Sequence, residues 1–255
     1  MTALSLTLSQ LRYVNKAYWR NPARAFFTFA FPLMFLVIFT ALLGNGTLQI
    51  GAMTVKESTY YVASMATFGV ITACFNNIAL QMTYGRDAGI LKRLDGTPLP
   101  RASFFVSRIA HAVLLAVLLV AITAVFGRLA FSAQFPSGTT LLEFLVMLLV
   151  GAGAFCALGL AITAVIPNGD AAPAIVNIAS LPVLFLSGIF IPFDNRTAQW
   201  IRSVASIFPV RHFAAGMQAG FLGTPFHWSD VAVVAAWGTG GLLLSIRYFR
   251  WESQG

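Results

Sequence analysis

The sequence predicts an all-α, polytopic membrane protein that forms one domain over residues 1–255. Of the 255 residues, 58% are hydrophobic and only 9% are charged, whereas soluble domains carry roughly a quarter charged residues. The apolar residues occur in continuous runs rather than in the alternating pattern of barrel strands, and a run of about 20 residues can cross a bilayer as one helix. Because the backbone in lipid must satisfy its own hydrogen bonds, each run is expected to be helical.

Residues 1–24 are predicted to form an amphipathic helix on the membrane surface. The apolar residues of this segment share one helical face: Leu4, Leu8, Leu11, Val14 and Tyr18. Basic residues recur every four positions on another face: Arg12, Lys16 and Arg20. The polar run is too long before the first apolar segment for a signal peptide.

Six apolar runs are long enough to be transmembrane helices. They comprise residues 25–43, 59–82, 103–126, 141–166, 171–191 and 230–248. Eleven of the 16 Lys and Arg residues fall on the side that carries both termini. The positive-inside rule therefore predicts that both termini and the loop between the second and third spans are cytoplasmic. The net charge of +8 is explained by this topology, and no nucleic-acid partner is expected.

The segment from 192 to 229 is predicted to form two short re-entrant helices that dip into the outer membrane surface before the last span. Trp200, Val204 and Ile207 share one helical face, and Pro209 interrupts the pattern. Large apolar residues then recur every four positions, at Phe213, Met217 and Phe221. This pattern is typical of interfacial amphipathic helices. The alternative is an ordinary loop with two aromatic anchors. The shorter segment 44–58 is expected to be a plain loop.

The longest polar stretch runs from Arg86 to Arg101, between the second and third spans. Within it, Ile90, Leu91 and Leu94 recur at helical spacing,. Asp87 is expected to cap the N-terminus of this short helix, which would run from Asp87 to Leu94. Gly96, Pro98 and Pro100 are expected to end it.

Two stripes of uncharged polar residues lie inside predicted spans. The second span carries Thr67, Asn77 and Gln81 on one face, together with Cys74. The fifth span carries Asn177, Ser180 and Ser187. Such groups in lipid face either protein or a water-filled path. The stripes therefore indicate either interhelical hydrogen bonds or the lining of a substrate path.

Chemistry-bearing motifs do not occur in the sequence. It contains no Gly-x-x-x-x-Gly-Lys-Ser/Thr phosphate loop, so ATP is not expected to bind in that way,. The three histidines have no metal-ligand spacing, and no metal or catalytic residue is expected,. An ion-coupled transporter would be expected to carry a carboxylate inside a span, and an intramembrane enzyme would be expected to carry clustered Asp or His. Neither feature is evident.

Two motifs carry a family resemblance. The first follows the pattern Arg-acid-x-Gly-x-Leu-x-x-Leu-x-x-Thr-Pro at Arg86, Asp87, Gly89, Leu91, Leu94, Thr97 and Pro98. The second comprises 186–193 (LSGIFIPF), then Trp200 and Ile201, then Phe208 and Pro209. In this order and spacing, with the surface helix and six spans, the sequence resembles the membrane subunit of type-2 ABC exporters, the group that includes drug, polysaccharide and lipid-linked export systems.

The resemblance implies a mechanism that composition does not show. The cytoplasmic helix would be a coupling helix that docks on a separate ATPase subunit, present in two copies, which binds ATP and Mg. A second permease copy, or a similar permease, would complete the pathway in the lipid of the plasma membrane, in a bacterium. The expected substrate is drug-like, lipid-like or otherwise hydrophobic, as in multidrug or antibiotic efflux. The alternatives are export of a polysaccharide or lipid-linked glycan, and ion-coupled secondary transport.

Overall fold

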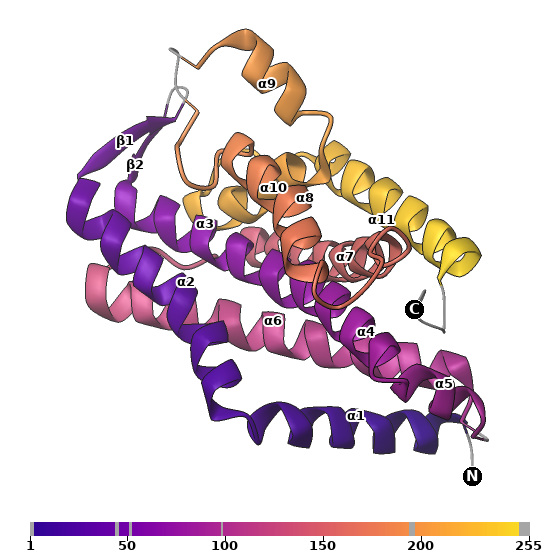
Figure 1. Ribbon diagram of the computed structural model, residues 1–255. Helices are drawn as coiled ribbons and strands as arrows, with labels where there is room; N and C mark the ends of the chain where they lie inside the picture. Colours follow the sequence, from indigo (N-terminus) through magenta and orange to yellow (C-terminus); the bar gives the residue numbers. More distant parts are fainter. Residues whose placement is uncertain (1–2, 44–45, 51–52, 98, 194–196, 250–255) are drawn as a thin grey trace.

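The structure, a computed structural model, describes residues 3–43, 46–50, 53–97, 99–193 and 197–249 (Figure 1). In this part of the chain, five helical segments are long and apolar enough to cross a membrane. They are α2 (Pro22–Leu43), the continuous helix Glu57–Asp87, α6 (Arg101–Phe131), α7 (Thr139–Ile162) and α11 (Trp228–Tyr248). The predicted all-α membrane fold is confirmed.

The fifth predicted span, 171–191, forms a shorter helix than the sequence predicts. It forms α8 (Ala172–Leu186), an apolar helix of 15 residues. Such a helix is about 22 Å long, less than the hydrocarbon thickness of about 30 Å. The chain turns directly after α8 because Gly188 adopts a positive φ of 78°, a conformation that glycine reaches without strain,.

The second predicted span is the most buried helix of the bundle, and it is not a regular α-helix. It consists of α3 (Glu57–Ile71), the π-helical segment η1 (Thr72–Asn76) and α4 (Asn77–Asp87). The backbone of α7 comes very close to η1 at Gly159. A Cβ added to this glycine would lie only 2.7 Å from the carbonyl oxygen of Phe75, so a larger residue would not fit there. A π-turn holds one residue more than an α-turn, so the residues after it are rotated by about 100° relative to an uninterrupted α-helix.

The two short helices predicted between 192 and 229 are present as α9 (Gln199–Ala205) and α10 (Pro209–Leu222). The second of them lies deeper than the sequence suggests, because it packs against α3, α7 and α11. Phe213 and Met217 are fully buried there, and Phe221 is nearly so. On the α9 side, Trp200 and Ile207 remain exposed.

A β-hairpin occupies the segment that was expected to be a plain loop. Strand β1 (Thr47–Ile50) pairs with β2 (Met53–Lys56) in antiparallel register, with Leu48 opposite Val55. The sequence signal was present but short: two β-prone runs of four residues on either side of Gly51 and Ala52,.

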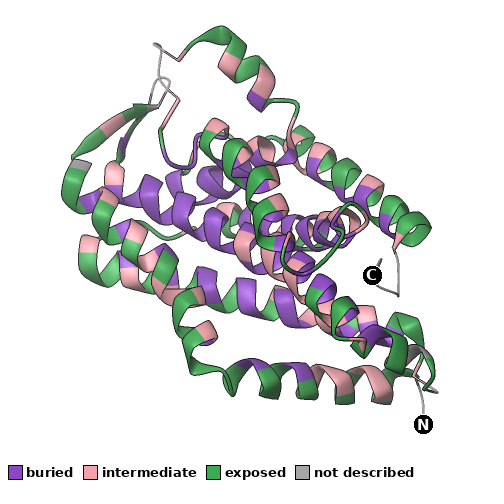
Figure 2. Cartoon of the chain, viewed as in Figure 1, coloured by how far each residue is buried: buried purple, intermediate pink, exposed green. Residues whose placement is uncertain are grey.

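The predicted N-terminal amphipathic helix is α1 (Ala3–Trp19), and it runs beside the first part of α6 (Figure 1). Its protein-facing side is narrower than predicted, since Val14 and Tyr18 are buried whereas Leu4 and Leu8 are exposed. Buried residues accordingly form only a few patches on α1, in contrast with their dense run along α3 (Figure 2).

Small residues set the close contact between α7 and α11. A Cβ built on Gly238 would lie 2.6 Å from the Cβ of Ala154 and 2.8 Å from its Cα. On the same helix, a Cβ on Gly240 would meet nothing within 4 Å. Gly238 therefore holds the two helices at a distance that no other residue permits.

Replacement of Gly238 by Ala should lower the free energy of unfolding by roughly 1–3 kcal/mol, because α7 and α11 must separate. Replacement of Gly240 by Ala in the same helix is the matched control. It should leave stability unchanged or raise it by up to about 1 kcal/mol, since alanine is the better helix former. Reversible denaturation in mixed micelles measures both. Equal effects of the two variants would contradict the close-packing interpretation.

Candidate coupling site

The short helix in the polar stretch begins later than predicted. Asp87 is the last residue of α4 rather than an N-cap, so that prediction is wrong. The chain then turns through Ala88 and Gly89, and α5 (Ile90–Asp95) follows. Gly89 has a φ of 66°, and a glycine in this left-handed conformation reverses the chain before a helix can restart,. Gly96 follows the last residue of α5, as expected.

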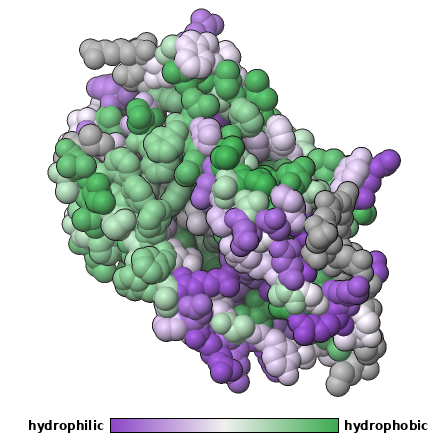
Figure 3. Space-filling view, in the orientation of Figure 1, coloured by the Kyte–Doolittle hydropathy of each residue, from purple (hydrophilic) through white to green (hydrophobic). Residues whose placement is uncertain are grey.

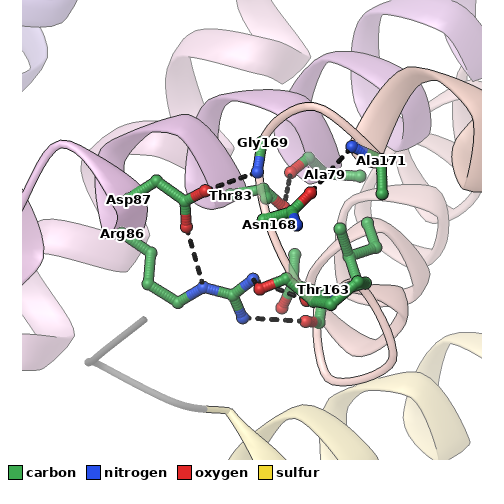
Figure 4. A network of polar contacts seen from close by, with 10 residues as sticks. Ala79, Thr83, Arg86, Asp87, Thr163, Asn168, Gly169 and Ala171 are labelled. Atoms are coloured by element: carbon green, nitrogen blue, oxygen red, sulfur yellow. Dashed lines mark hydrogen bonds and ion pairs between the residues drawn. The ribbon is translucent and has the colours of Figure 1, made fainter. Parts of the chain in front are cut away.

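Arg86 binds the end of α7. Its side chain is only 4% exposed, and its guanidinium donates to the carbonyl oxygens of Thr163 at 3.1 Å and Ile166 at 2.6 Å (Figure 4). Helix α7 ends at Ile162, so both carbonyls belong to the turn that follows the helix, beside its negative C-terminal end,. The buried cation therefore satisfies backbone carbonyls just after α7 and is itself stabilised by them.

Asp87 binds the connection between α7 and α8. One carboxylate oxygen accepts a hydrogen bond from the backbone N–H of Gly169, and the other lies 3.7 Å from Nε of Arg86. Gly169 is packed so closely that a Cβ there would lie 3.0 Å from the Tyr84 ring. We call the contacts of Arg86 and Asp87 with residues 163–169 the loop junction. It joins the end of α4 to both α7 and α8.

Helix α5 presents one face to the protein and one face outward. Leu91 is 1% exposed and lies against α4 near Gly85, and Leu94 packs against the same core. In contrast, Ile90 is 43% exposed, and Lys92 and Arg93 are exposed beside it. The outward face of α5 is thus an apolar side chain flanked by two cations.

Thr97 ends this segment by donating its hydroxyl to the carbonyl of Leu94 at 2.7 Å. Pro98, the last residue of the predicted coupling motif, lies outside the described residues. The geometry thus divides the motif into Arg86 and Asp87, which hold the loop junction, and α5, which can contact a partner. Their coupling role stays a prediction.

The far end of α8 is also attached to the second span. The hydroxyl of Tyr60 donates to the carbonyl of Gly188, and the amide of Gln218 donates to the same oxygen at 3.4 Å and to Ser64 at 3.0 Å. Arg211 of α10 lies 4.7 Å from the Phe193 ring, and burial lowers the pKa of this guanidinium below its usual value. Helix α8 is therefore joined to the second span at both ends, through the loop junction and through Tyr60.

The six residues predicted to line a substrate path do not come together. The hydroxyls of Thr67, Ser180 and Ser187 bond back to carbonyls of the preceding turn, at 2.8, 2.8 and 2.7 Å. Asn177 is exposed on α8. Asn77 and Gln81 instead bond to Arg24 and Arg108. The predicted stripe assumed a regular α-helix, and the π-turn at η1 separates Thr67 from the two amides.

An apolar cavity of about 310 Å³ opens between α7, α8, α11 and the start of α10. Ser180 is a polar residue of its lining, which otherwise comes mostly from aliphatic and aromatic side chains such as Phe75, Phe155, Phe208 and Trp237. The sequence carried no signal for this cavity, because its walls come from segments distant in the chain. In the described part of the chain, no three His, Cys, Asp or Glu side chains gather as metal ligands.

A helical membrane protein in which α5 and the connection after α7 are both fixed to the second span matches a known family. The family model described as ABC-2 type transporter matches residues 6–222. The chain belongs to this family. It is therefore a multi-pass membrane permease subunit of an ABC transporter, and the family resemblance inferred from the motifs is confirmed. Residues that bind the ATPase or the substrate are not assigned by this match.

Three curated proteins are similar to the chain. The putative transport permease ycf38 of the red alga Porphyra purpurea is 24% identical over 86% of this chain and 75% of its own. The same-named protein of Pyropia yezoensis is 23% identical over the same shares. The probable multidrug ABC transporter permease YbhR of Escherichia coli is 26% identical over 60% of this chain and 39% of its own. With relatives in algae and in a bacterium, the predicted bacterial origin stays a prediction.

Replacement of Arg86 by Gln should lower the free energy of unfolding by about 2–3 kcal/mol, because buried carbonyls lose a charged donor and Asp87 loses its counter-ion. Arg93→Gln is the matched control. Arg93 also donates to carbonyls, those of Ala88 and Gly89, but it is exposed. Its replacement should cost less than about 0.5 kcal/mol. Denaturation in mixed micelles compares the two, and a larger loss for Arg93→Gln would refute the loop junction.

Proposed function

We propose that this ABC-2 permease exports a hydrophobic substrate, and that ATP hydrolysis in a separate ATPase subunit drives the export through α5. The observation that carries the proposal is the construction of α5. Leu91 anchors one face in the protein, and the loop junction fixes the preceding turn, while Ile90 and its basic neighbours face outward. A rigidly mounted surface helix of this kind is suited to receive a force from a docked partner.

The loop junction links α5 mechanically to the membrane helices. Arg86 and Asp87 connect the base of α5 to the end of α7 and to the residues before α8. The Tyr60 contact connects the far end of α8 to the second span. A displacement of α5 would therefore move α4, α7 and α8 together, and α7 and α8 form two walls of the apolar cavity.

The apolar cavity supports a drug-like or lipid-like substrate. Its lining is dominated by aliphatic and aromatic side chains, and such a surface binds hydrophobic molecules through burial of apolar area,. The relative YbhR is described as a multidrug permease, which agrees with this class. The alternative, a polysaccharide or lipid-linked glycan, would need polar groups for its sugar hydroxyls, and the cavity offers few.

The other alternative, an ion-coupled transporter, is less well supported. Such a transporter needs a titratable carboxylate within its spans. The acidic side chains that the structure describes are all at least partly exposed and lie near helix ends or in connections: Glu57, Asp87, Glu143, Asp170 and Asp230. ATP and Mg are accordingly assigned to the partner subunit, with two such subunits and a second permease completing the transporter. Both termini are assigned to the cytoplasmic side of the plasma membrane.

The docking role of α5 is tested by Ile90→Asp. Replacing an apolar side chain at the centre of an interface with a charged one should reduce the amount of bound ATPase roughly tenfold. Ile90 is already 43% exposed, so the fold should tolerate the change. The measurement is ATPase activity that co-purifies per mole of permease in mild detergent, followed by ATP-dependent uptake of a fluorescent hydrophobic dye into inverted vesicles.

Ile246→Asp is the control for this experiment. Ile246 is 74% exposed near the end of α11, on the side predicted to be cytoplasmic, and it receives the same charge. We expect normal co-purification and uptake for this variant. Normal uptake by Ile90→Asp would reject α5 as the docking element, and uptake by the permease without any ATPase would reject the ATP-driven mechanism.

A further inference from the structure

A polar cavity of about 220 Å³ lies between α1 and the helices α2, α4 and α6. Basic side chains enter it from two spans: Arg24 from α2, with Arg108 and His111 from α6. No acidic residue is among those that line it. Hydrophilic residues also cover the lower face of the molecule over α1, whereas a broad hydrophobic face lies above it (Figure 3).

Neutral amides hold the two arginines in place. Arg24 donates to the amide oxygen of Asn77, and Arg108 donates to that of Gln81 at 2.9 Å. Gln81 in turn donates to Asn77 at 2.8 Å. The amides fix the positions of the guanidinium groups but cancel no charge, so two like charges stand in one partly buried cavity at an electrostatic cost.

The cavity also contains donors without partners. His111 is 2% exposed, and neither of its ring nitrogens has a hydrogen-bond partner within the described residues. The Nε of Arg108 is likewise buried and unpaired there. Buried polar atoms are almost always satisfied, because a lost hydrogen bond is expensive away from water. Uncompensated positive charge together with unpaired donors indicates that an anion with several acceptor oxygens belongs in this space.

A second, mainly apolar cavity lies on the other side of Arg24. It measures about 300 Å³, lies between α2 and the second span, and shares Arg24 with the polar cavity. Its other walls are mainly apolar, including Phe27, Phe31, Pro32 and Phe68. The shared arginine therefore stands between a polar compartment and an apolar one, which matches a molecule with an anionic head and a hydrocarbon tail.

We propose that these two cavities bind one anionic lipid, with its phosphate between Arg24, Arg108 and His111 and an acyl chain beside Phe31. Guanidinium groups match phosphate oxygens in pairs and form strong charge-assisted hydrogen bonds with them. The lipid neutralises the arginines and joins α1 to three spans. This assignment does not rest on the proposed transport function, because no residue that lines these two cavities belongs to α5 or lines the apolar cavity beside α8.

The test uses the purified full chain in nanodiscs of phosphatidylcholine with a small fraction of phosphatidic acid. Native mass spectrometry counts retained phosphatidic acid. We expect Arg24→Gln/Arg108→Gln to weaken retention at least tenfold. The control is Arg247→Gln, which removes a single exposed charge near the end of α11 and should retain the lipid. Equal retention by the double variant and the wild type would overturn the site.

A second pair of variants leaves every native contact in place. Ala17 of α1 is exposed and lines the polar cavity, so a longer side chain can enter without displacing the core. Ala17→Glu places a carboxylate beside the arginines and should exclude the phosphate. Ala17→Gln has the same shape without the charge and should retain the lipid. Equal retention by these two variants would contradict an anion site.

A final arm separates a lipid from a free anion. In detergent without lipid, millimolar inorganic phosphate should raise the midpoint temperature of unfolding far less than micromolar phosphatidic acid, because only the lipid fills the apolar cavity. An equal effect of inorganic phosphate would overturn the lipid assignment. Loss of the phosphatidic acid effect in Ala17→Glu, but not in Ala17→Gln, would support it.

Discussion

The contact of Arg86 with the C-terminus of α7 fixes the relative positions of the helices on the side predicted to be cytoplasmic. A cation that is 4% exposed persists only where oxygen atoms surround it,. Here the oxygens are backbone carbonyls of the non-helical segment that follows α7, at Thr163 and Ile166. The carbonyls stabilise the buried charge, and the guanidinium supplies the hydrogen bonds that the carbonyls need. The end of α4, the end of α7 and the start of α8 are consequently held as one unit, and α5 extends from that unit.

Other arginines of the chain are likewise bound mainly by uncharged groups rather than by carboxylates. The chain has 16 Lys and Arg but only 8 Asp and Glu, so carboxylates cannot pair with most of its cations. Arg86 relies chiefly on backbone carbonyls, Arg24 and Arg108 on amide oxygens, and Arg211 on an aromatic face. Carbonyls and amides position a guanidinium without neutralising it. Positive charge therefore remains available on the permease wherever such a group meets a cavity.

Hydropathy predicted the spans because continuous apolar runs in lipid leave the backbone no alternative to helix. It overestimated 171–191 because Ile189, Phe190 and Ile191 are apolar yet follow the end of α8. Local spacing placed α5 but misassigned Asp87, because its hydrogen-bond partner Gly169 lies 82 residues away in the chain. The polar residues of the second span do not share one face for a related reason: the π-turn at η1, against which Gly159 packs, cannot be recognised from the spacing of the apolar residues.

The π-turn has a consequence for how homologues are aligned. Its extra residue, inserted within Thr72–Asn76, sets the angular position of everything that follows in the second span, including Arg86. A relative whose span is uninterrupted would need one residue fewer to bring its arginine to the same place. Alignments across this point should therefore admit a one-residue gap in the middle of a membrane helix, where gaps are ordinarily confined to loops.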